Sequence, residues 1–234
     1  MILAFDTATD QLTAALGTVE RIEARYHEPA PRAHLGRLLP VIDSLFAKAG
    51  RDRRDIDAIA VGIGPGSFTG LRIGVSTAQG LARSLDKPLV GISTLDIVAR
   101  QVADGRAGGS PESRIFPISD AKRREVYTAE FDGDGKRLGD YRSLYPADLA
   151  RELEEFGAKA VLAGDGLKRY PDELAIAREA EYAPETQWVP NASVLIALAE
   201  ERIRLEEVGP YFKVLPIYIR LSDAEENRKR EKSS

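Results

Sequence analysis

The residue types that perform most enzyme chemistry are scarce in this sequence. Its 234 residues contain no cysteine and only two histidines, His27 and His34. A disulfide, a thiolate nucleophile and a cysteine-ligated metal are therefore excluded. One helical turn after His34 stands Leu38, so the pair of ligands that a helical metal site needs at i and i+4 is missing. A triad built on Ser67 and His34 has no nucleophile motif to support it.

The most unusual stretch covers residues 62–74 and holds five glycines in thirteen residues. At a junction between a strand and a helix, such a loop exposes backbone N–H groups that can bind an anion. It has no lysine for a Walker motif, and Pro65 and Thr69 stand where an esterase elbow needs glycine. The dinucleotide-binding pattern also fails, because Ser67 occupies its last glycine position. Two interpretations stay open: an anion-binding loop, and a loop whose glycines permit tight turning and close helix packing.

Two aspartates each follow an apolar run that predicts a strand. Asp6, with Thr7 and Thr9 beside it, ends the first run, and Asp120 ends a similar run in the second half. Two carboxylates that face each other across a cleft could hold Mg²⁺ and a nucleotide phosphate. The alternative is that Asp6 and Thr9 only shape a hairpin turn.

The elements that must position these residues alternate between strands and helices. The first half predicts strands at 2–6, 12–16, 21–26, 57–61 and 88–92, and helices at 34–49, 73–85 and 93–102. The order of strand, acid, meander, helix and strand then returns at 114–120, 125–131, 137–144, 146–156 and 160–163, followed by a helix at 192–207. Helices that connect strands require parallel pairs, so the pattern predicts an α/β fold with a duplicated unit.

We expect an N-terminal lobe over 1–104, a linker over 105–113, a C-terminal lobe over 114–222 and a charged, disordered tail over 223–234. The last helix of the second lobe is also free to pack back on the first. The net charge of −4 provides no general attraction to nucleic acid. The first apolar run is too short for a signal peptide, and no run of about 18 apolar residues occurs, so we expect a cytoplasmic protein without a membrane segment.

Four parts of the sequence together resemble the TsaB (YeaZ) family over nearly the whole chain. They are residues 2–9, residues 64–74 with 78–81, residues 120–121 with 125–127, and residues 216–220. The Pro-Gly-Ser-Phe-Thr-Gly-Leu-Arg run in the second part is highly specific. The resemblance implies two ribonuclease-H-like lobes of the acetate kinase, sugar kinase, Hsp70 and actin superfamily, which agrees with the duplicated order.

The role that the resemblance implies is a non-catalytic scaffold for threonylcarbamoylation of the adenosine beside the anticodon, in tRNAs that read codons starting with A. The implied partners are a TsaD-like catalytic subunit with a metal on a His-x-x-x-His helix, a TsaE-like ATPase, and a second copy of the chain as a homodimer. Contact with tRNA is expected to be indirect. In this sequence Leu38 follows His34 where the catalytic subunit has its second metal-binding histidine. The resemblance implies this loss for the non-catalytic subunit. No cofactor is expected, and a nucleotide would bind only weakly or at an assembled interface. The residues that would form vestigial contacts with a nucleotide are Asp6, Thr7, Thr9 and Asp120.

We expect the partner and dimer surface to come from two helices. Its residues would be His34, Leu38, Val41, Leu45, Arg72, Ser76, Gln79 and Arg83. Small residues at 74, 78 and 80 would let a related helix approach closely. The alternative is that these positions only cover their own sheet.

Two other functions compete with the scaffold. An ATP-dependent phosphotransferase of the same superfamily would use Asp6 and the Gly164-Asp165-Gly166 turn as phosphate loops. A peptidase is suggested by an older glycoprotease label for the family, but the sequence offers neither metal ligands nor a nucleophile motif for it.

Overall fold

The first lobe is built on a five-stranded sheet with β1 at its centre. The computed structural model describes residues 1–30, 34–105, 112–175 and 177–219. The strands are β1 (Ile2–Asp6), β2 (Gln11–Gly17), β3 (Ile22–Pro29), β4 (Ala58–Gly62) and β5 (Leu89–Ile92). Their order in the sheet is β3-β2-β1-β4-β5. Strand β2 pairs antiparallel with both β1 and β3, and β4 pairs parallel with both β1 and β5. Every residue of β1 and β4 is buried, as expected for strands covered on both faces.

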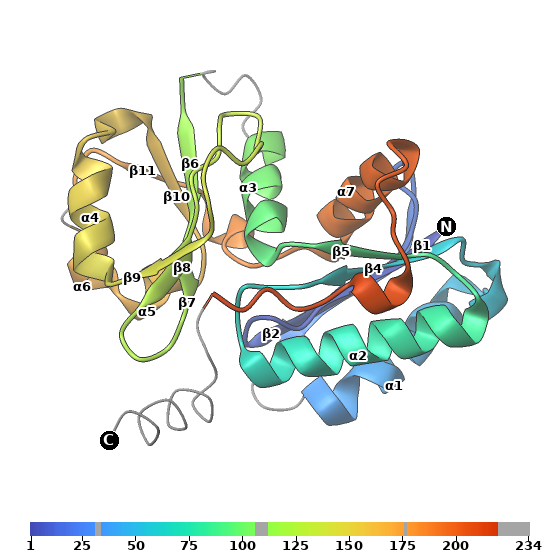
Figure 1. Cartoon of the computed structure of the whole chain (residues 1–234). Coiled ribbons are helices and arrows are strands. Elements are labelled where there is room, and N and C mark those ends of the chain that lie inside the picture. The colour runs from blue at the N-terminus through green and yellow to red at the C-terminus, as the bar shows by residue number, and fades with distance from the viewer. Residues whose placement is uncertain (31–33, 106–111, 176, 220–234) are drawn as a thin grey trace.

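Helices cover both faces of this sheet (Figure 1). They are α1 (His34–Ala49) and α2 (Phe68–Leu85) on one face and α7 (Ala192–Arg204) on the other. The alternation of side chains along β1 sends Leu3 and Phe5 into the core under α1 and α2, and Ile2 and Ala4 into the core under α7. The last long helix of the chain therefore packs on the first lobe.

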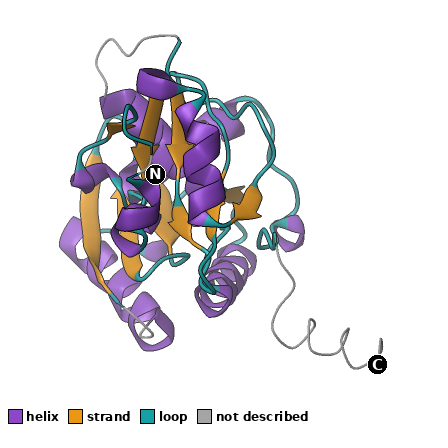
Figure 2. Cartoon of the chain, turned by 90° about the vertical axis from the view of Figure 1, so that its left-hand side faces the viewer, coloured by secondary structure: helices purple, strands orange, loops and turns teal. Residues whose placement is uncertain are grey.

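The second lobe holds two small sheets, with helices packed around them (Figure 2). The parallel sheet has the order β11-β10-β6, and the antiparallel sheet has the order β7-β8-β9. These strands are β6 (Arg114–Pro117), β7 (Ser119–Asp120), β8 (Val126–Thr128), β9 (Arg142–Leu144), β10 (Ala160–Ala163) and β11 (Glu181–Tyr182). The helices are α4 (Pro146–Glu154), α5 (Gly166–Arg169) and α6 (Pro171–Leu174). Helix α3 (Thr94–Gly105) packs on both β6 and α7 and so joins the lobes. Short 3-10 helices lie at Arg53–Asp55, Gly157–Lys159, Glu185–Gln187 and Tyr211–Lys213.

The predicted α/β class and the second meander are confirmed, but the first strand of that meander is broken. It divides into β6 and β7 at Pro117, because proline has no N–H to donate to a ladder. Bridges from Phe131 to Ile115 and to Arg137 continue the meander between the sheets. Most of the predicted linker (106–111) and all of the predicted tail lie outside the described residues. Among the residues that are described, no helix is long and apolar enough to cross a membrane.

Candidate functional site: the glycine-rich loop, the interlobe cleft and the α1–α2 surface

The glycine-rich loop connects β4 to α2 and lies directly against the end of β1. A Cβ atom at Gly66 would lie 2.3 Å from the Ala8 carbonyl oxygen, and one at Gly70 would lie 2.0 Å from the Thr7 carbonyl oxygen. A Cβ atom at Gly74 would lie 2.3 Å from the Thr7 hydroxyl oxygen. These distances are much shorter than a van der Waals contact distance. The backbone of α2 can therefore approach β1 this closely only because the residues are glycines.

The N-terminus of α2 finds hydrogen-bond partners within the chain. The Ser67 N–H donates to the Ala8 carbonyl at 2.7 Å, and the Ser67 hydroxyl accepts from the Gly70 N–H at 3.2 Å. The serine is thus the N-cap of the helix. Of the two interpretations of the loop, the structure supports close helix packing.

Asp6 and Thr7, two of the predicted nucleotide contacts, are fully buried. The Asp6 carboxylate accepts from the Ala8 N–H and from the Thr94 hydroxyl, each at 2.7 Å. Burial raises the pKa of Asp6, and these two bonds oppose that rise. The Thr7 hydroxyl donates to the Gly70 carbonyl at 2.8 Å. Both side chains therefore bind the chain itself, joining β1 to α2 and to α3, and neither lines an open cleft.

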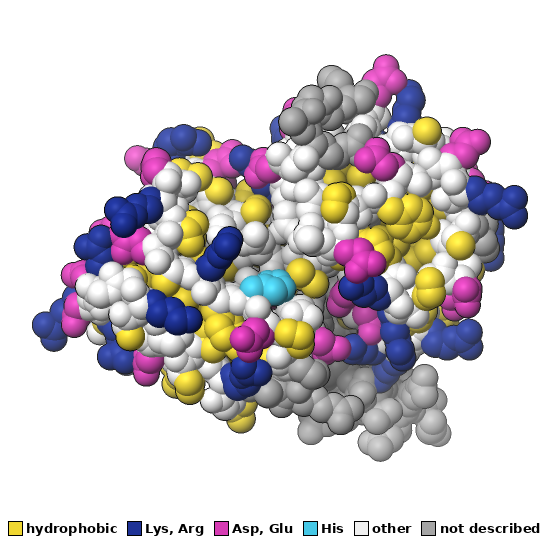
Figure 3. Space-filling view, turned by 180° about the vertical axis from the view of Figure 1, so that it is seen from behind, with side chains coloured by type: hydrophobic (Ala, Val, Ile, Leu, Met, Phe, Trp, Pro, Cys, Tyr) yellow, Lys and Arg dark blue, Asp and Glu magenta, His cyan; other side chains and the backbone are white. Residues whose placement is uncertain are grey.

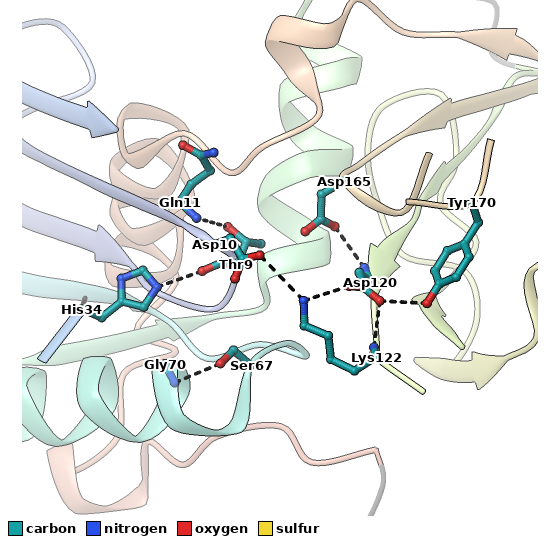
Figure 4. A network of polar contacts seen from close by, with 10 residues as sticks. All are labelled: Thr9, Asp10, Gln11, His34, Ser67, Gly70, Asp120, Lys122, Asp165 and Tyr170. Carbon is teal, nitrogen blue, oxygen red and sulfur yellow. Dashed lines mark hydrogen bonds and ion pairs between the residues drawn. The ribbon is translucent and has the colours of Figure 1, made fainter. Parts of the chain in front are cut away.

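Lys122 occupies the position between the acidic groups of the two lobes (Figure 4). Its Nζ lies 2.8 Å from Asp120 in β7 and 3.7 Å from Asp10 in the loop after β1. The Tyr170 hydroxyl also donates to Asp120, and the Asp120 N–H donates to Asp165. Burial raises the pKa of Asp120, but its bonds to Lys122 outweigh that effect and hold the pKa below its usual value. The ammonium group thus balances Asp120, one of the two carboxylates predicted to hold Mg²⁺, together with Asp10 of the first lobe.

Thr9, in the loop after β1, contacts His34 at the start of α1. The His34 Nε2 lies 3.0 Å from the Thr9 carbonyl oxygen, so this nitrogen is the donor, and the buried Nδ1 has no partner among the described residues. The Thr9 hydroxyl accepts from the Gln11 N–H at 3.2 Å, which is the turn-shaping role that the sequence left open. Leu38 is buried one turn after His34, and His27 lies exposed on β3.

The predicted partner surface needs a correction. Leu38, Val41 and Leu45 are buried in the core of the first lobe, so they cannot reach a partner while the lobe is folded. His34, which was also predicted for this surface, is buried against the Thr9 carbonyl. The large apolar side chains that α1 exposes are Leu35 (78% exposed) and Leu39 (52% exposed). The apolar stripe of α1 is wider than one face, and spacing alone did not show which leucines turn inward.

Helix α2 keeps most of its predicted surface residues accessible. Arg72, Ser76 and Arg83 are exposed, whereas Gln79 is half-buried and donates to the Val214 carbonyl at 2.9 Å. Helices α1 and α2 pack against each other on the same side of the sheet. We define the α1–α2 face as the exposed residues Leu35, Gly36, Leu39, Arg72, Ser76, Gly80 and Arg83.

Known proteins resemble this chain in sequence and in structure. Residues 21–166 match the family model "TsaD: tRNA N6-adenosine threonylcarbamoyltransferase". The "tRNA threonylcarbamoyladenosine biosynthesis protein TsaB" of Escherichia coli (strain K12) is 35% identical over 73% of this chain and 74% of its own. The protein of the same name from Bacillus subtilis (strain 168) is 31% identical over 96% of each chain. This chain belongs to the TsaB family.

A solved structure of a TsaB (YeaZ) relative confirms the predicted fold. YeaZ from Pseudomonas aeruginosa superposes with a TM-score of 0.76 at 32% identity, over 93% of this chain and 98% of its own. The two-lobed superfamily fold that the TsaB resemblance implied is therefore present.

Two features of this TsaB-family chain escaped the sequence analysis. Lys122 belongs to a basic cluster that pattern alone marks as a solvated face, and its position between two lobes depends on tertiary structure. Leu35 and Leu39 lie within the helix predicted at 34–49, but the pattern did not mark them as its exposed part. Spacing alone gave no signal that separates them from Leu38 and Leu45, since the apolar stripe of α1 is wider than one face.

Proposed function

We propose that this chain is a non-catalytic subunit that binds and activates a TsaD-like transferase in tRNA threonylcarbamoylation. The names of its relatives support the pathway. The match of residues 21–166 to a TsaD family model supports a partner of similar fold, because related folds can pair pseudo-symmetrically through equivalent surfaces. In this proposal a TsaE-like ATPase joins the assembled pair, and a homodimer of the chain competes for the same surface.

The observation that carries the proposal is the composition of the α1–α2 face. Gly36 and Gly80 belong to helices, yet a Cβ atom at either position would meet none of the described residues within 4 Å. Gly80, in the interior of α2, costs its helix about 1 kcal/mol relative to alanine. The fold of the chain itself gains nothing from these two glycines, in contrast to those at 66, 70 and 74. A second helix that packs closely on this face explains them, because bare backbone lets two helices approach.

The exposed leucines give the same face a source of binding free energy. Burying a leucine side chain contributes about 1.5 to 3 kcal/mol, and Leu35 and Leu39 are both largely exposed. Arg72 lies 4.0 Å over the Phe68 ring at the edge of the face. An arginine held over an aromatic ring is a frequent contributor at protein interfaces.

The cleft between the lobes supports a subunit without its own chemistry. Asp6 is enclosed by protein bonds, and Lys122 lies between Asp10 and Asp120. A phosphotransferase would need these carboxylates available to Mg²⁺ and nucleotide. Lys and Arg side chains are interspersed with Asp and Glu on the surface seen in Figure 3, which favours indirect contact with tRNA on that side.

Leu35→Asp and Leu39→Asp test the proposed surface, with Leu138→Asp as the matched control. Leu138 is 51% exposed and lies in the second lobe, away from the α1–α2 face. We expect each α1 variant to weaken binding of a TsaD-like protein by about tenfold or more, because a buried unpaired carboxylate is costly. Calorimetric titration measures the affinity, and thermal unfolding shows that the chain still folds.

Reconstitution of tRNA modification tests the role itself. The α1 variants should lower threonylcarbamoyl transfer in proportion to their loss of binding, whereas Leu138→Asp should leave it unchanged. Repeated turnover by the transferase, adenylate source and ATPase without this chain would refute the subunit role. Tight binding of Mg-ATP by the isolated chain would favour the phosphotransferase instead.

A further inference from the structure

Residues 208–219 form the last described segment of the chain and run alongside α2 (Figure 1). The Val214 carbonyl accepts a hydrogen bond from the Gln79 side chain of α2 at 2.9 Å. Further along, the Tyr218 ring lies 5.1 Å from the Phe68 ring at the start of α2. The segment is therefore held against α2 at two separate points, and its backbone has a fixed place on the surface.

Three large side chains of this segment are largely exposed. Phe212, Leu215 and Tyr218 are 61%, 63% and 45% exposed. Because their backbone is already fixed, these side chains lose little conformational freedom when a partner covers them. We define the C-terminal strip as these three residues together with Lys213 and Arg72, which are both exposed. The Arg72 Nε lies 3.5 Å from the Tyr218 hydroxyl, so α2 and the segment meet within the strip.

The charged side chains of this region are all positive. Residues 62–85 and 208–219 hold Arg72, Arg83 and Lys213 but no aspartate or glutamate, although the chain has 37 acidic residues. None of the ion pairs between described residues involves these three cations. The strip therefore complements a surface that carries carboxylates.

A groove beside the strip has room for a side chain of a partner. It lies between residues 209–215 and the edge strand β5, and its volume is about 280 Å³. Most of its lining residues are apolar, and its charged residues are Arg202, Lys213 and one carboxylate, Glu207. The groove thus keeps an excess of positive charge. A partner segment that combines apolar side chains with carboxylates fits both the groove and the strip.

Other occupants match the charge of the strip less well. A second copy of the chain brings the same cations, so two strips that faced each other would repel. Residues 220–234 hold five cationic and four acidic side chains, so they are not an acidic segment. A nucleic acid binds mainly through its phosphates, whereas the strip has two cations beside three large apolar or aromatic side chains.

We propose that the surface for the TsaD-like transferase continues from α2 onto the C-terminal strip, where the transferase presents an acidic segment with apolar side chains. This inference rests on the proposed function, because it takes the transferase as the partner. Arg72 joins the two surfaces, since it belongs to the α1–α2 face and also lies against Tyr218. Arginine and tyrosine are the residue types that often dominate binding at interfaces. The charge of the strip then favours the transferase over a second copy of the chain.

Lys213→Glu and Phe212→Ala test the strip without altering the α1–α2 face. Calorimetric titration of each full-length variant with the transferase, without tRNA, gives the affinity. We expect each variant to bind about tenfold more weakly than the parent chain. Lys159→Glu and Tyr145→Ala are the matched controls, because both residues are exposed and lie in the second lobe. Both controls should bind as the parent chain does.

Salt dependence tests the acidic partner without relying on any variant. The affinity of the parent chain for the transferase should fall as the NaCl concentration rises, and that of Lys213→Glu should fall less. A parent affinity that does not change with NaCl would overturn the proposal. Unfolding curves show that each variant is folded at the temperature of the titration.

The outcomes separate the strip from the subunit role. If Leu39→Asp weakens the transferase while Lys213→Glu and Phe212→Ala bind it as the parent chain does, the strip proposal is wrong and the subunit role stands. If the parent chain does not bind the transferase at all, both proposals are wrong.

The same variants identify a different occupant. Weaker self-association of Lys213→Glu in sedimentation equilibrium, with unchanged binding of the transferase, would assign the strip to a second copy. Weaker binding of tRNA alone, with unchanged binding of the transferase, would assign it to RNA. Glu225→Lys combined with Glu226→Lys should leave the affinity for the transferase unchanged, and a gain in affinity would assign the strip to residues 220–234. Each of these three results would overturn the proposal.

Discussion

Two glycines of α2 should respond in opposite directions when each is replaced by alanine. Gly80 lies on the exposed side of the helix with open space where a Cβ would stand. The Gly80→Ala change therefore raises the free energy of unfolding by about 1 kcal/mol, because it increases helix propensity and causes no clash. In a chain of this size that gain corresponds to a rise in Tm of about 2 to 4 °C.

The same change at Gly74 meets the end of β1. A Cβ there would lie 2.3 Å from the Thr7 hydroxyl oxygen, which itself donates to the Gly70 carbonyl. Overpacking costs about 1 to 3 kcal/mol, and loss of the hydrogen bond costs about 0.5 to 1.5 kcal/mol. After the gain in helix propensity, Gly74→Ala should still destabilise the chain by about 1 to 3 kcal/mol.

Urea unfolding followed by circular dichroism measures both effects on one scale. The two variants should differ by about 2 to 4 kcal/mol in the free energy of unfolding, with the same dependence on urea concentration. Equal shifts, or a stabilising Gly74→Ala, would refute the assignment of the glycine-rich segment to close packing. A destabilising Gly80→Ala would show that the backbone at 80 is required by the fold of the chain and not by a partner.

Three further predictions test other parts of the structure. Lys122→Met should cost about 0.5 to 1 kcal/mol at pH 7, since the pair is partly exposed. The pKa of Asp120 is lowered in the folded chain, so the pair contributes its full stabilisation above the ordinary aspartate pKa. The difference between the two chains should shrink as the pH falls from that value and vanish below the lowered pKa, where Asp120 of the folded chain protonates. Leu45→Ala should cost about 2 to 5 kcal/mol, whereas Leu35→Ala should cost less than about 0.5 kcal/mol, when both are measured by urea unfolding. Ser67→Ala should cost about 1 kcal/mol, because it removes the N-cap of α2.

Local patterns in the sequence predicted the elements of the fold well. Apolar runs indicated β1 and β4 because both strands are buried on two faces. Ser93 was recognised as the start of α3, and its hydroxyl accepts from the Leu95 N–H in the structure. These signals depend on interactions within a few residues, which is why they can be found without the fold.

The parts that could not be predicted depend on contacts between distant segments. Lys122 reaches Asp10 only because the hairpin between β7 and β8 is brought against the loop after β1. Asp6 has the residue type of a cation ligand, but its bond to Thr94, 88 residues away, encloses it. Nothing in either local pattern distinguishes a carboxylate that binds a ligand from one that binds the chain itself.

In the proposed subunit role, the enclosed polar groups would let the glycine-rich segment support partner binding without touching a partner. Thr7 connects β1 to α2 through the Gly70 carbonyl, and Asp6 connects β1 to Thr94 at the start of α3. These bonds hold the inner side of α2 against the sheet, so its outer side is presented at a defined height beside α1. Gly74→Ala should therefore weaken partner binding indirectly, by shifting or loosening α2. Gly80→Ala should weaken partner binding by a direct steric clash with the partner, while it stabilises the free chain. Partner affinity measured for both variants at a temperature where each remains folded separates positioning from contact, and unchanged affinity for Gly80→Ala would mean that no helix packs on this side of α2.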